Sequence, residues 1–136
     1  MRRIAIVCLF VVVAVSLAGC VTGPGFVEEQ TIPDGKAEVY LYRPIHLYGD
    51  VITPMIMTNE GFLTLLDAGG YYSYITNAGT LRFWAVSYSA SLPITVEAVA
   101  GQKYYVKIGF AAETCTLTLV PQETAKTDIA YCRRVQ

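Results

Sequence analysis

The sequence predicts an all-β domain, a sandwich or partly open barrel, with one short helix near its C-terminus. Short runs of β-branched and aromatic residues follow one another from residue 36, and clusters of Gly, Pro, Asn and Asp separate them. A helical pattern appears in QETAKTDIAYCRR, after Pro121. Because helices do not alternate with the expected strands, a sandwich is favoured over a parallel sheet covered by helices.

The N-terminal segment has the layout of a secretory signal. Arg2 and Arg3 form a short basic start, and the apolar run of residues 4–18 follows without a charged side chain. A spanning helix needs about 20 apolar residues, and this run ends earlier, just before Cys20. We therefore expect residues 1–19 to be a signal peptide, with an uncleaved membrane anchor as the alternative.

The tetrapeptide Leu17-Ala18-Gly19-Cys20 closes the apolar run and resembles the lipobox of bacterial lipoproteins. The resemblance implies that Cys20 receives a diacylglycerol, that cleavage precedes it, and that its new amino group is acylated, usually with palmitate. Two or three acyl chains anchor a protein stably, at about 0.8 kcal/mol per buried methylene. Val21 stands where an aspartate would signal inner-membrane retention, so we expect the periplasmic face of the outer membrane.

Residues 20–35 predict a lipidated flexible tether, and residues 36–136 predict a single domain. The tether is rich in Gly, Pro and Glu, and packing of part of it through Phe26 or Ile32 stays open. Without the signal, eight basic and eleven acidic side chains remain, a formal charge of −3. This charge supports neither nucleic-acid binding nor a polybasic membrane patch, and the pair Arg133-Arg134 is too short to change that interpretation.

The first expected strands are marked by the residues that end them. KAEVYLYRP closes at Pro44, and VITPMIM, residues 51–57, contains Pro54, which confines it to an edge or a bulged strand. Either a partner covers this apolar strand or it packs beneath the tether. The next runs are FLTLL, YYSYI and TLRFWAV, preceded by the turns NEG, DAGG and TNAG.

Two later runs, LPITVEAV and KYYVKIGF, are separated by Ala100-Gly101-Gln102, which predicts a β-hairpin. Strand alternation assigns the residues of the second run to two faces. One face holds Tyr104, Val106, Ile108 and Phe110, and the other holds Tyr105, Lys107 and Gly109.

The C-terminal run predicts a disulfide between Cys115 and Cys132. TCTLTLVP alternates so that Cys115 points inward, and the helix that follows, with arginines in its last turn, carries Ala125, Ile129 and Cys132 on one face. Both sulfurs would then face one interface in an oxidising compartment, where a bridge adds about 3 kcal/mol. Two independent buried thiols are the alternative.

The motifs KAEVYLYRP, GYYSYI, AGTLRFWA and VEAVAGQKYYVKI carry a further resemblance. Over residues 36–120 the chain is similar to the small bacterial lipoproteins catalogued as domain of unknown function twenty-eight forty-six. The resemblance implies an immunoglobulin-like β-sandwich of short antiparallel strands on a lipid tether, and it brings no reaction, ligand or catalytic residue. The turn Asn77-Ala78-Gly79 departs from the Pro-Gly expected there, which leaves its type open.

No set of residues in the sequence forms a convincing catalytic pattern. His46 is the one histidine, with Asp50 four residues on, and a solvated loop side chain is its simplest interpretation. Ser87, Ser89 and Ser91 lack the G-x-S-x-G elbow and are interpreted as strand-end and loop positions. Without a set of ligands at metal-binding spacing, we expect neither a metal nor a cofactor. A small serine/histidine hydrolase using His46, Asp50 and a serine is the alternative function.

Tyrosines are the remaining candidate feature. Tyr71, Tyr72 and Tyr74, with Tyr104 and Tyr105, would form an aromatic platform for a glycan or a protein partner. In the alternative, half of the tyrosines fill the sandwich core and half shield its exposed face, as β-propensity predicts. The sequence as a whole predicts a lipid-anchored, non-catalytic envelope module that binds a protein or a cell-wall partner.

Overall fold

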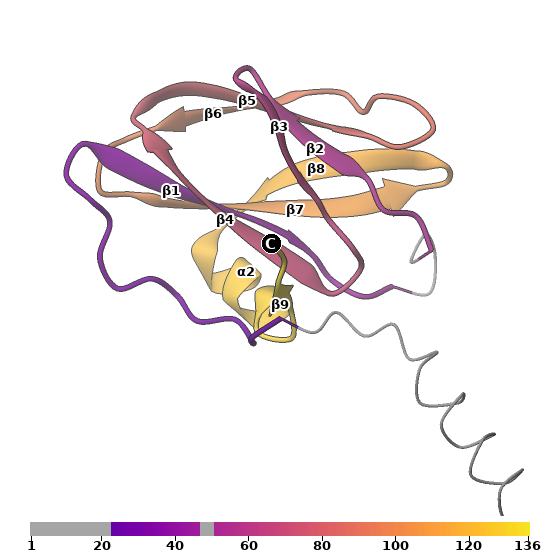
Figure 1. Cartoon of the computed structure of the whole chain (residues 1–136), viewed down its shortest axis with the longest axis horizontal. Coiled ribbons are helices and arrows are strands. Elements are labelled where there is room, and N and C mark those ends of the chain that lie inside the picture. Colours follow the sequence, from indigo (N-terminus) through magenta and orange to yellow (C-terminus); the bar gives the residue numbers. More distant parts are fainter. Residues whose placement is uncertain (1–22, 47–50) are drawn as a thin grey trace, which may run out of the picture.

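Two β-sheets pack face to face in the described chain, residues 23–46 and 51–136 of a computed structural model (Figure 1). Sheet A has the order β8-β7-β1-β4-β9 and sheet B the order β3-β2-β5-β6. The strands of sheet A are β1 (Lys36–Arg43), β4 (Gly70–Asn77), β7 (Lys103–Ala111), β8 (Thr114–Val120) and β9 (Arg133–Arg134). Those of sheet B are β2 (Met55–Thr58), β3 (Gly61–Leu65), β5 (Gly79–Val86) and β6 (Ile94–Ala98).

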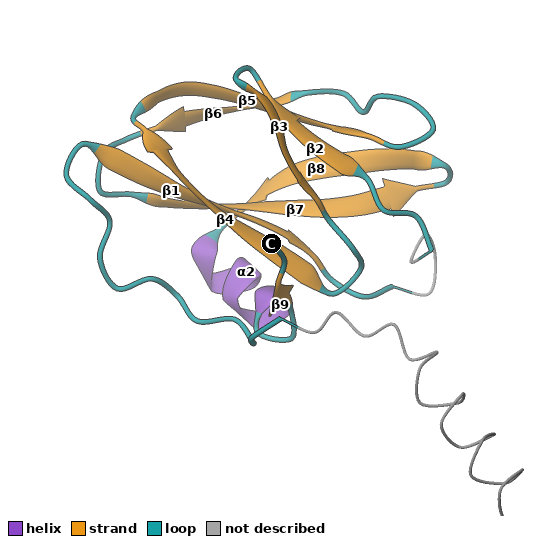
Figure 2. Cartoon of the chain, in the orientation of Figure 1, coloured by secondary structure: helices purple, strands orange, loops and turns teal. Residues whose placement is uncertain are grey.

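A short helix, α2 (Gln122–Ile129), lies outside the sandwich against sheet A (Figure 2). The all-β sandwich with a short C-terminal helix that the sequence predicts is therefore confirmed. The predicted signal peptide, Cys20 and Asp50 lie outside the described residues.

Strand β1 runs through the middle of sheet A and is buried on both faces. Every residue from Ala37 to Arg43 is buried, including Glu38 and the two tyrosines on the outer side, as expected for a strand covered on both faces. It pairs antiparallel with β4 but parallel with β7, and β9 pairs parallel with β4. The expected antiparallel pairing thus fails at these two pairs, because β7 enters sheet A from β6 of sheet B and β9 enters it after α2, so that neither is joined to its partner by a hairpin.

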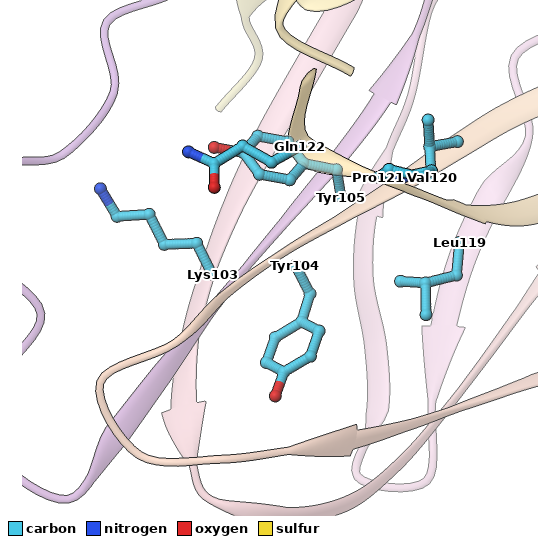
Figure 3. A pocket seen from close by; sticks show the side chains of 7 residues that line it. All are labelled: Lys103, Tyr104, Tyr105, Leu119, Val120, Pro121 and Gln122. Atoms are coloured by element: carbon cyan, nitrogen blue, oxygen red, sulfur yellow. The ribbon is translucent and has the colours of Figure 1, made fainter. Parts of the chain in front are cut away.

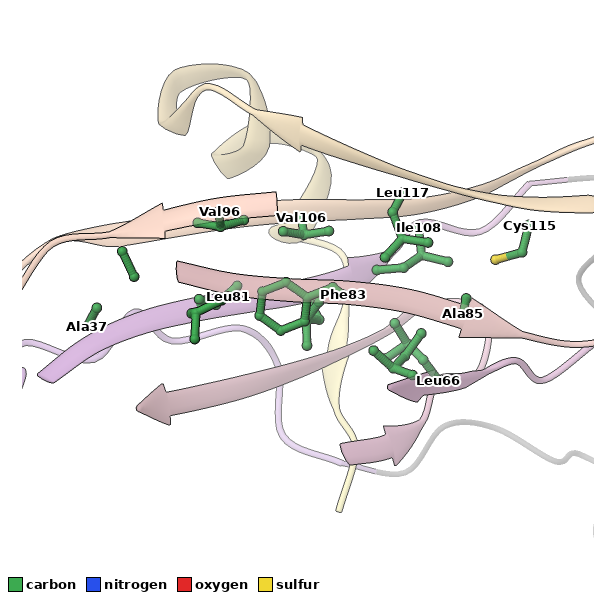
Figure 4. Close-up of a cluster of buried hydrophobic side chains, with 14 residues drawn as sticks. Ala37, Leu66, Leu81, Phe83, Ala85, Val96, Val106, Ile108, Cys115 and Leu117 are labelled. Atoms are coloured by element: carbon green, nitrogen blue, oxygen red, sulfur yellow. The ribbon is translucent and has the colours of Figure 1, made fainter. Parts of the chain in front are cut away.

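The sandwich core lies between the two sheets (Figure 4). It is made by the inward residues of each strand, since alternate side chains point to opposite faces. Its buried members are Ala37, Val39, Leu41, Ile56, Leu66, Leu81, Phe83, Ala85, Val96, Ala98, Val106, Ile108, Cys115 and Leu117. Burying one of the larger aliphatic or aromatic side chains contributes about 1.5–3 kcal/mol, so this layer is the main source of cohesion between the sheets.

The segment Ala100-Gly101-Gln102 turns the chain but does not close a hairpin. Gly101 has a φ of 81°, and the N–H of Gln102 donates to the carbonyl of Val99 at 3.1 Å. The strands on either side belong to different sheets, β6 to sheet B and β7 to sheet A. The predicted hairpin is therefore wrong, because a tight turn does not determine which strand the chain pairs with next.

The strand predicted at residues 51–57 begins only at Met55. Pro54 has no N–H to donate to a ladder, and its carbonyl instead accepts the N–H of Leu66 at 3.1 Å. Further along, the register between β2 and β3 shifts after Ile56, so that Leu63 is an extra, bulged residue.

The helix is shorter than the sequence pattern indicated. Pro121 precedes its first residue as predicted, and Ala125 and Ile129 are buried against sheet A. It ends at Ile129, and the arginines expected in its last turn form β9 beside β4 instead.

Residues 23–35, which we call the strap, lie across the outer face of sheet A. The N–H of Phe26 donates to the carbonyl of Cys132 at 3.1 Å, and the N–H of Glu29 donates to the hydroxyl of Tyr40 at 2.8 Å. The ring of Phe26 meets those of Tyr40 and Tyr71 edge-on, at 5.3 and 5.1 Å between centroids. A flexible tether is therefore not what residues 23–35 form, whereas the packing of Phe26 is confirmed.

Candidate functional site

The predicted platform of Tyr71, Tyr72 and Tyr74 is not formed, because alternation along β4 sends these rings to opposite faces. Tyr71 is buried on the outer face of sheet A, beneath Phe26. Tyr72 and Tyr74 pack against the sandwich core, and the hydroxyl of Tyr74 donates to Glu60 at 2.7 Å. The alternative interpretation holds for Tyr72 and Tyr74, which pack on the core, whereas Tyr71 lies on a sheet face that the strap covers and not on an exposed one.

The predicted disulfide is also wrong. Cys115 and Cys132 are both free and buried. Cys115 lies in the core between the sheets, whereas Cys132 lies on the other side of sheet A, beneath the strap and α2. Both sulfurs are inward, as the sequence predicted, but sheet A has two covered faces, and each cysteine faces a different one.

Neither thiol has the environment of a nucleophile. Burial raises the pKa of Cys115 and of Cys132 to about 11. For Cys132 the nearby negative charge of Asp128 raises the pKa further. Both groups are therefore protonated at neutral pH, and the thiolate is the reactive form of cysteine.

His46 lines a cavity of about 370 Å³ at the C-terminal end of α2, together with Thr127, Asp128, Tyr131 and Cys132. No serine is among the residues that line this cavity.

The serines predicted as alternatives lie after β5, where Ser91 is buried. Its hydroxyl accepts the N–H of Ala85 at 2.9 Å and donates to the carbonyl of Leu92 at 3.1 Å. Ser91 thus stabilises its own loop. The structure does not bring it to the cavity of His46.

A second cavity, of about 320 Å³, lies where β7 and β8 meet the start of α2 (Figure 3). Its walls include Tyr105, Leu119 and Pro121, with Lys103 at one side. The ammonium of Lys103 lies 3.3 Å from Glu28 and also donates to the carbonyl of Glu29. Its charge is therefore used to hold the strap.

No helix in residues 23–46 and 51–136 has the length and apolar character needed to cross a bilayer. In the same ranges, no group of three or more His, Cys, Asp or Glu side chains is arranged to hold a metal ion.

The outer face of sheet B presents an apolar surface over three neighbouring strands. We call this the outer apolar face, and its residues are Met55, Met57, Phe62, Leu65, Trp84 and Val86. Its members point outward because their neighbours Ile56, Phe83 and Ala85 point into the core.

Strand register groups these side chains in two rows. Met57 stands opposite Phe62 on one side and Trp84 on the other. Met55 likewise stands opposite Leu65 and Val86. Directly opposed residues lie about 4.5–5.5 Å apart between Cβ atoms, so each row is continuous. Phe62, Leu65 and Met55 are 57%, 50% and 40% exposed.

The other half of the same sheet face is polar. Arg82 pairs with Thr95, and the hydroxyl of Thr80 donates to Glu97 at 2.8 Å. The apolar half is thus bordered by charged and hydroxyl side chains, which is the usual layout of a protein interface.

Sequence reasoning identified only part of this surface. It marked VITPMIM as apolar on both faces, but not the contributions of FLTLL and TLRFWAV. The first of these runs also lacks polar alternation, and Trp84 lies out of phase with the core residues of its strand. These two features of the sequence could have indicated an apolar outer surface. The order of the strands was still needed to place the three runs side by side.

Comparisons of the chain with protein-family models, with curated proteins and with solved structures found no match. The resemblance to a lipoprotein family stated above therefore stays a prediction.

Proposed function

We propose that this chain is a lipid-anchored, non-catalytic envelope lipoprotein that binds a protein partner through the outer apolar face. The observation that carries this proposal is the six-residue apolar surface on three adjacent strands of sheet B. The lipobox-like ending at Cys20 supports the anchor, and Val21 supports the periplasmic face of the outer membrane.

Position argues that the partner is a protein rather than the anchoring membrane. The strap, α2 and Gly23 all lie on the outer side of sheet A, and Cys20 is three residues before Gly23. The outer apolar face is on the opposite layer of the sandwich, so the membrane holding Cys20 does not cover it. Methionine and aromatic side chains are also enriched at protein interfaces.

A matched pair of substitutions tests the binding proposal. Phe62→Lys places a charge within the outer apolar face, and Thr95→Lys places one on the polar half of the same sheet. We expect the wild type and Thr95→Lys, extracted in mild detergent, to elute with a mass above that of the monomer. Phe62→Lys should elute as the monomer, because the charge opposes burial of the surface.

Three outcomes would contradict this expectation. In the first, the Phe62→Lys protein elutes with the same high mass as the wild type. In the second, all three proteins elute as monomers. In the third, the wild type elutes with twice the mass of the chain. The last result would identify a second copy as the occupant. Since Phe62 is more than half exposed, its substitution should leave the urea midpoint within the scatter of surface variants.

The anchor is tested separately by metabolic labelling with palmitate. Cys20→Ala should abolish labelling and membrane association, because it removes the thiol that would be alkylated. Cys8→Ala, which lies within the predicted signal, should leave both unchanged. Labelling that persists in Cys20→Ala would rule out lipidation at that residue.

A further inference from the structure

The described chain begins beside the two arginines of β9, Arg133 and Arg134. The guanidinium of Arg133 donates to the carbonyl of Gly23 at 3.3 Å, and the backbone N–H of Arg134 donates to the carbonyl of Pro24 at 2.8 Å. A Cβ on Gly23 would lie 1.8 Å from the carbonyl oxygen of Arg134. The entry point is therefore held tightly against β9, as the start of the indigo segment in Figure 1 shows.

The short distance to Cys20 limits how far the domain can stand from a membrane. Three peptide steps separate Cys20 from Gly23. Even when fully extended they span at most about 11 Å, only a few ångströms more than one lipid headgroup layer of about 5–8 Å. A lipid on Cys20 would thus bring the surface around Gly23 to the headgroups.

That surface combines cationic, aromatic and aliphatic side chains. Tyr131 is 86% exposed and lies two residues before Arg133. Val27, 72% exposed, adjoins Phe26, whose N–H is bonded to Cys132. Ile45, 70% exposed, lines the same cavity as Tyr131. Tyrosine and arginine are among the residues that anchor proteins at the membrane–water interface, together with tryptophan and lysine.

We propose that this surface, the basal face (Val27, Ile45, Tyr131, Arg133 and Arg134), rests on anionic lipid headgroups of the anchoring membrane. The proposal depends on the lipidation of Cys20 proposed above. It assigns the strap a role beyond packing, because the strap holds Gly23, three residues after Cys20, beside the two arginines.

The positive charge that favours this orientation is confined to the two arginines of the basal face. Arg134 lies 3.7 Å from Glu29 and is half exposed, so part of its charge is compensated. Arg133 is exposed and bonded to a neutral carbonyl. An arginine near an anionic surface strengthens association by about fivefold, whereas the mature chain as a whole, with a formal charge of −3 that includes these two arginines, is repelled. The charge distribution therefore turns the arginines toward the lipid.

Tryptophan fluorescence provides the test, because the chain has one tryptophan and it lies on the opposite layer. The lipidated protein is reconstituted in vesicles of phosphatidylethanolamine and phosphatidylglycerol that contain a headgroup nitroxide quencher. Wild type reports from Trp84, and the double variant Trp84→Phe with Tyr131→Trp reports from the basal face. We expect strong quenching at position 131 and little at position 84.

Substitution of the arginines tests their part in the contact. Arg133→Gln with Arg134→Gln, made in the position-131 reporter, should lose most of that quenching in anionic vesicles. Arg82→Gln, an exposed arginine on sheet B, should change nothing.

Vesicle flotation separates failure of this proposal from failure of the anchor. If the protein floats with the vesicles but position 131 is no more quenched than position 84, the anchor stands and the basal face does not contact lipid. If quenching is equal with and without the two arginines, the charge argument is overturned. If the protein does not float, the lipidation itself is refuted, and the proposal falls with it.

Discussion

Glu28 is the residue that ties the strap to both sheet A and α2. Its carboxylate accepts the hydroxyl of Tyr105 at 2.8 Å and lies 3.3 Å from the ammonium groups of Lys103 and Lys126. Burial alone would raise the pKa of Glu28, but these hydrogen bonds and charges outweigh it and hold the pKa below its ordinary value of 4.5. The ionised form is therefore bound more strongly in the folded chain than in the unfolded one.

This pKa shift predicts how stability depends on pH. A carboxyl with a lowered pKa stabilises the fold above its unfolded pKa and loses that contribution as the pH falls through the folded value. We expect Glu28→Gln to lower the free energy of unfolding at pH 7 by up to about 1 kcal/mol, since solvent partly screens these partly exposed ion pairs. At pH 3 the two proteins should differ less.

Urea unfolding at both pH values measures this difference. Glu113→Gln, an exposed carboxylate in the turn after β7, is the control and should match the wild type at pH 7. A loss in Glu28→Gln that is the same at pH 7 and pH 3 would show that the charge of Glu28 is not what holds the strap.

The two buried thiols predict a second residue-level result. Because Cys115 and Cys132 face different layers, Cys115→Ala and Cys132→Ala should each cost on the order of 1 kcal/mol, and the double variant should cost their sum. Both thiols should be alkylated by iodoacetamide only after unfolding, without prior reduction. A double variant no less stable than either single one would indicate a bridge.

At this scale the sequence predicted which residues are inward but not which interface they face. Alternation correctly placed Cys115, Val106 and Tyr105 relative to their strand neighbours. It did not reveal that sheet A is covered on both sides, because covering depends on the strap and α2, which are distant in sequence. The predicted disulfide failed for this reason, whereas the tyrosine platform failed because alternation along β4 places Tyr71 on the face opposite to Tyr72 and Tyr74.

The strap is the element whose role differs most from its sequence pattern. Its Gly, Pro and Glu content is typical of a linker, yet Phe26 fills a space between Tyr40 and Tyr71. Bonds from Glu28 and Glu29 to strand and helix residues then satisfy the polar groups around the ring. A few specific contacts therefore order a segment that composition alone marks as flexible.

Truncation of the aromatic contact measures its contribution. Phe26→Ala should destabilise the domain by about 2 kcal/mol, because it removes a large apolar side chain and two edge-on ring contacts. Val27→Ala, at the adjacent exposed position, should change stability by less than about 0.5 kcal/mol. Equal midpoints for the two variants in urea would mean that the strap is not part of the cooperative fold.

The positions of the strands were predictable because each is a run of β-branched and aromatic residues that ends at a turn, which is a local feature of the sequence. The pairing of the strands was not predictable in this way. The turns after β4 and β6 both carry the chain from one sheet to the other, and a glycine at positive φ, such as Gly79 or Gly101, serves such a crossing as well as a hairpin. The parallel pairing of β1 with β7 likewise depends on the whole path of the chain.

The whole molecule has two distinct outer faces. Sheet A is covered by the strap and α2 and carries the entry point and the two arginines. Sheet B carries the outer apolar face on its outer side, where the described residues leave Phe62 and Leu65 at least half exposed. A chain anchored at Cys20 would direct the first face to the membrane and the second into the surrounding compartment, where a protein can reach it.

The most direct test of this account is site-specific photo-crosslinking in intact cells. A photoreactive residue replaces Phe62 in one protein and Thr95 in another, each otherwise unchanged and lipidated. We predict one dominant protein adduct from position 62 and none from position 95. Scattered adducts of equal intensity from both positions, or lipid adducts from position 62, would contradict a protein-binding role for the outer apolar face.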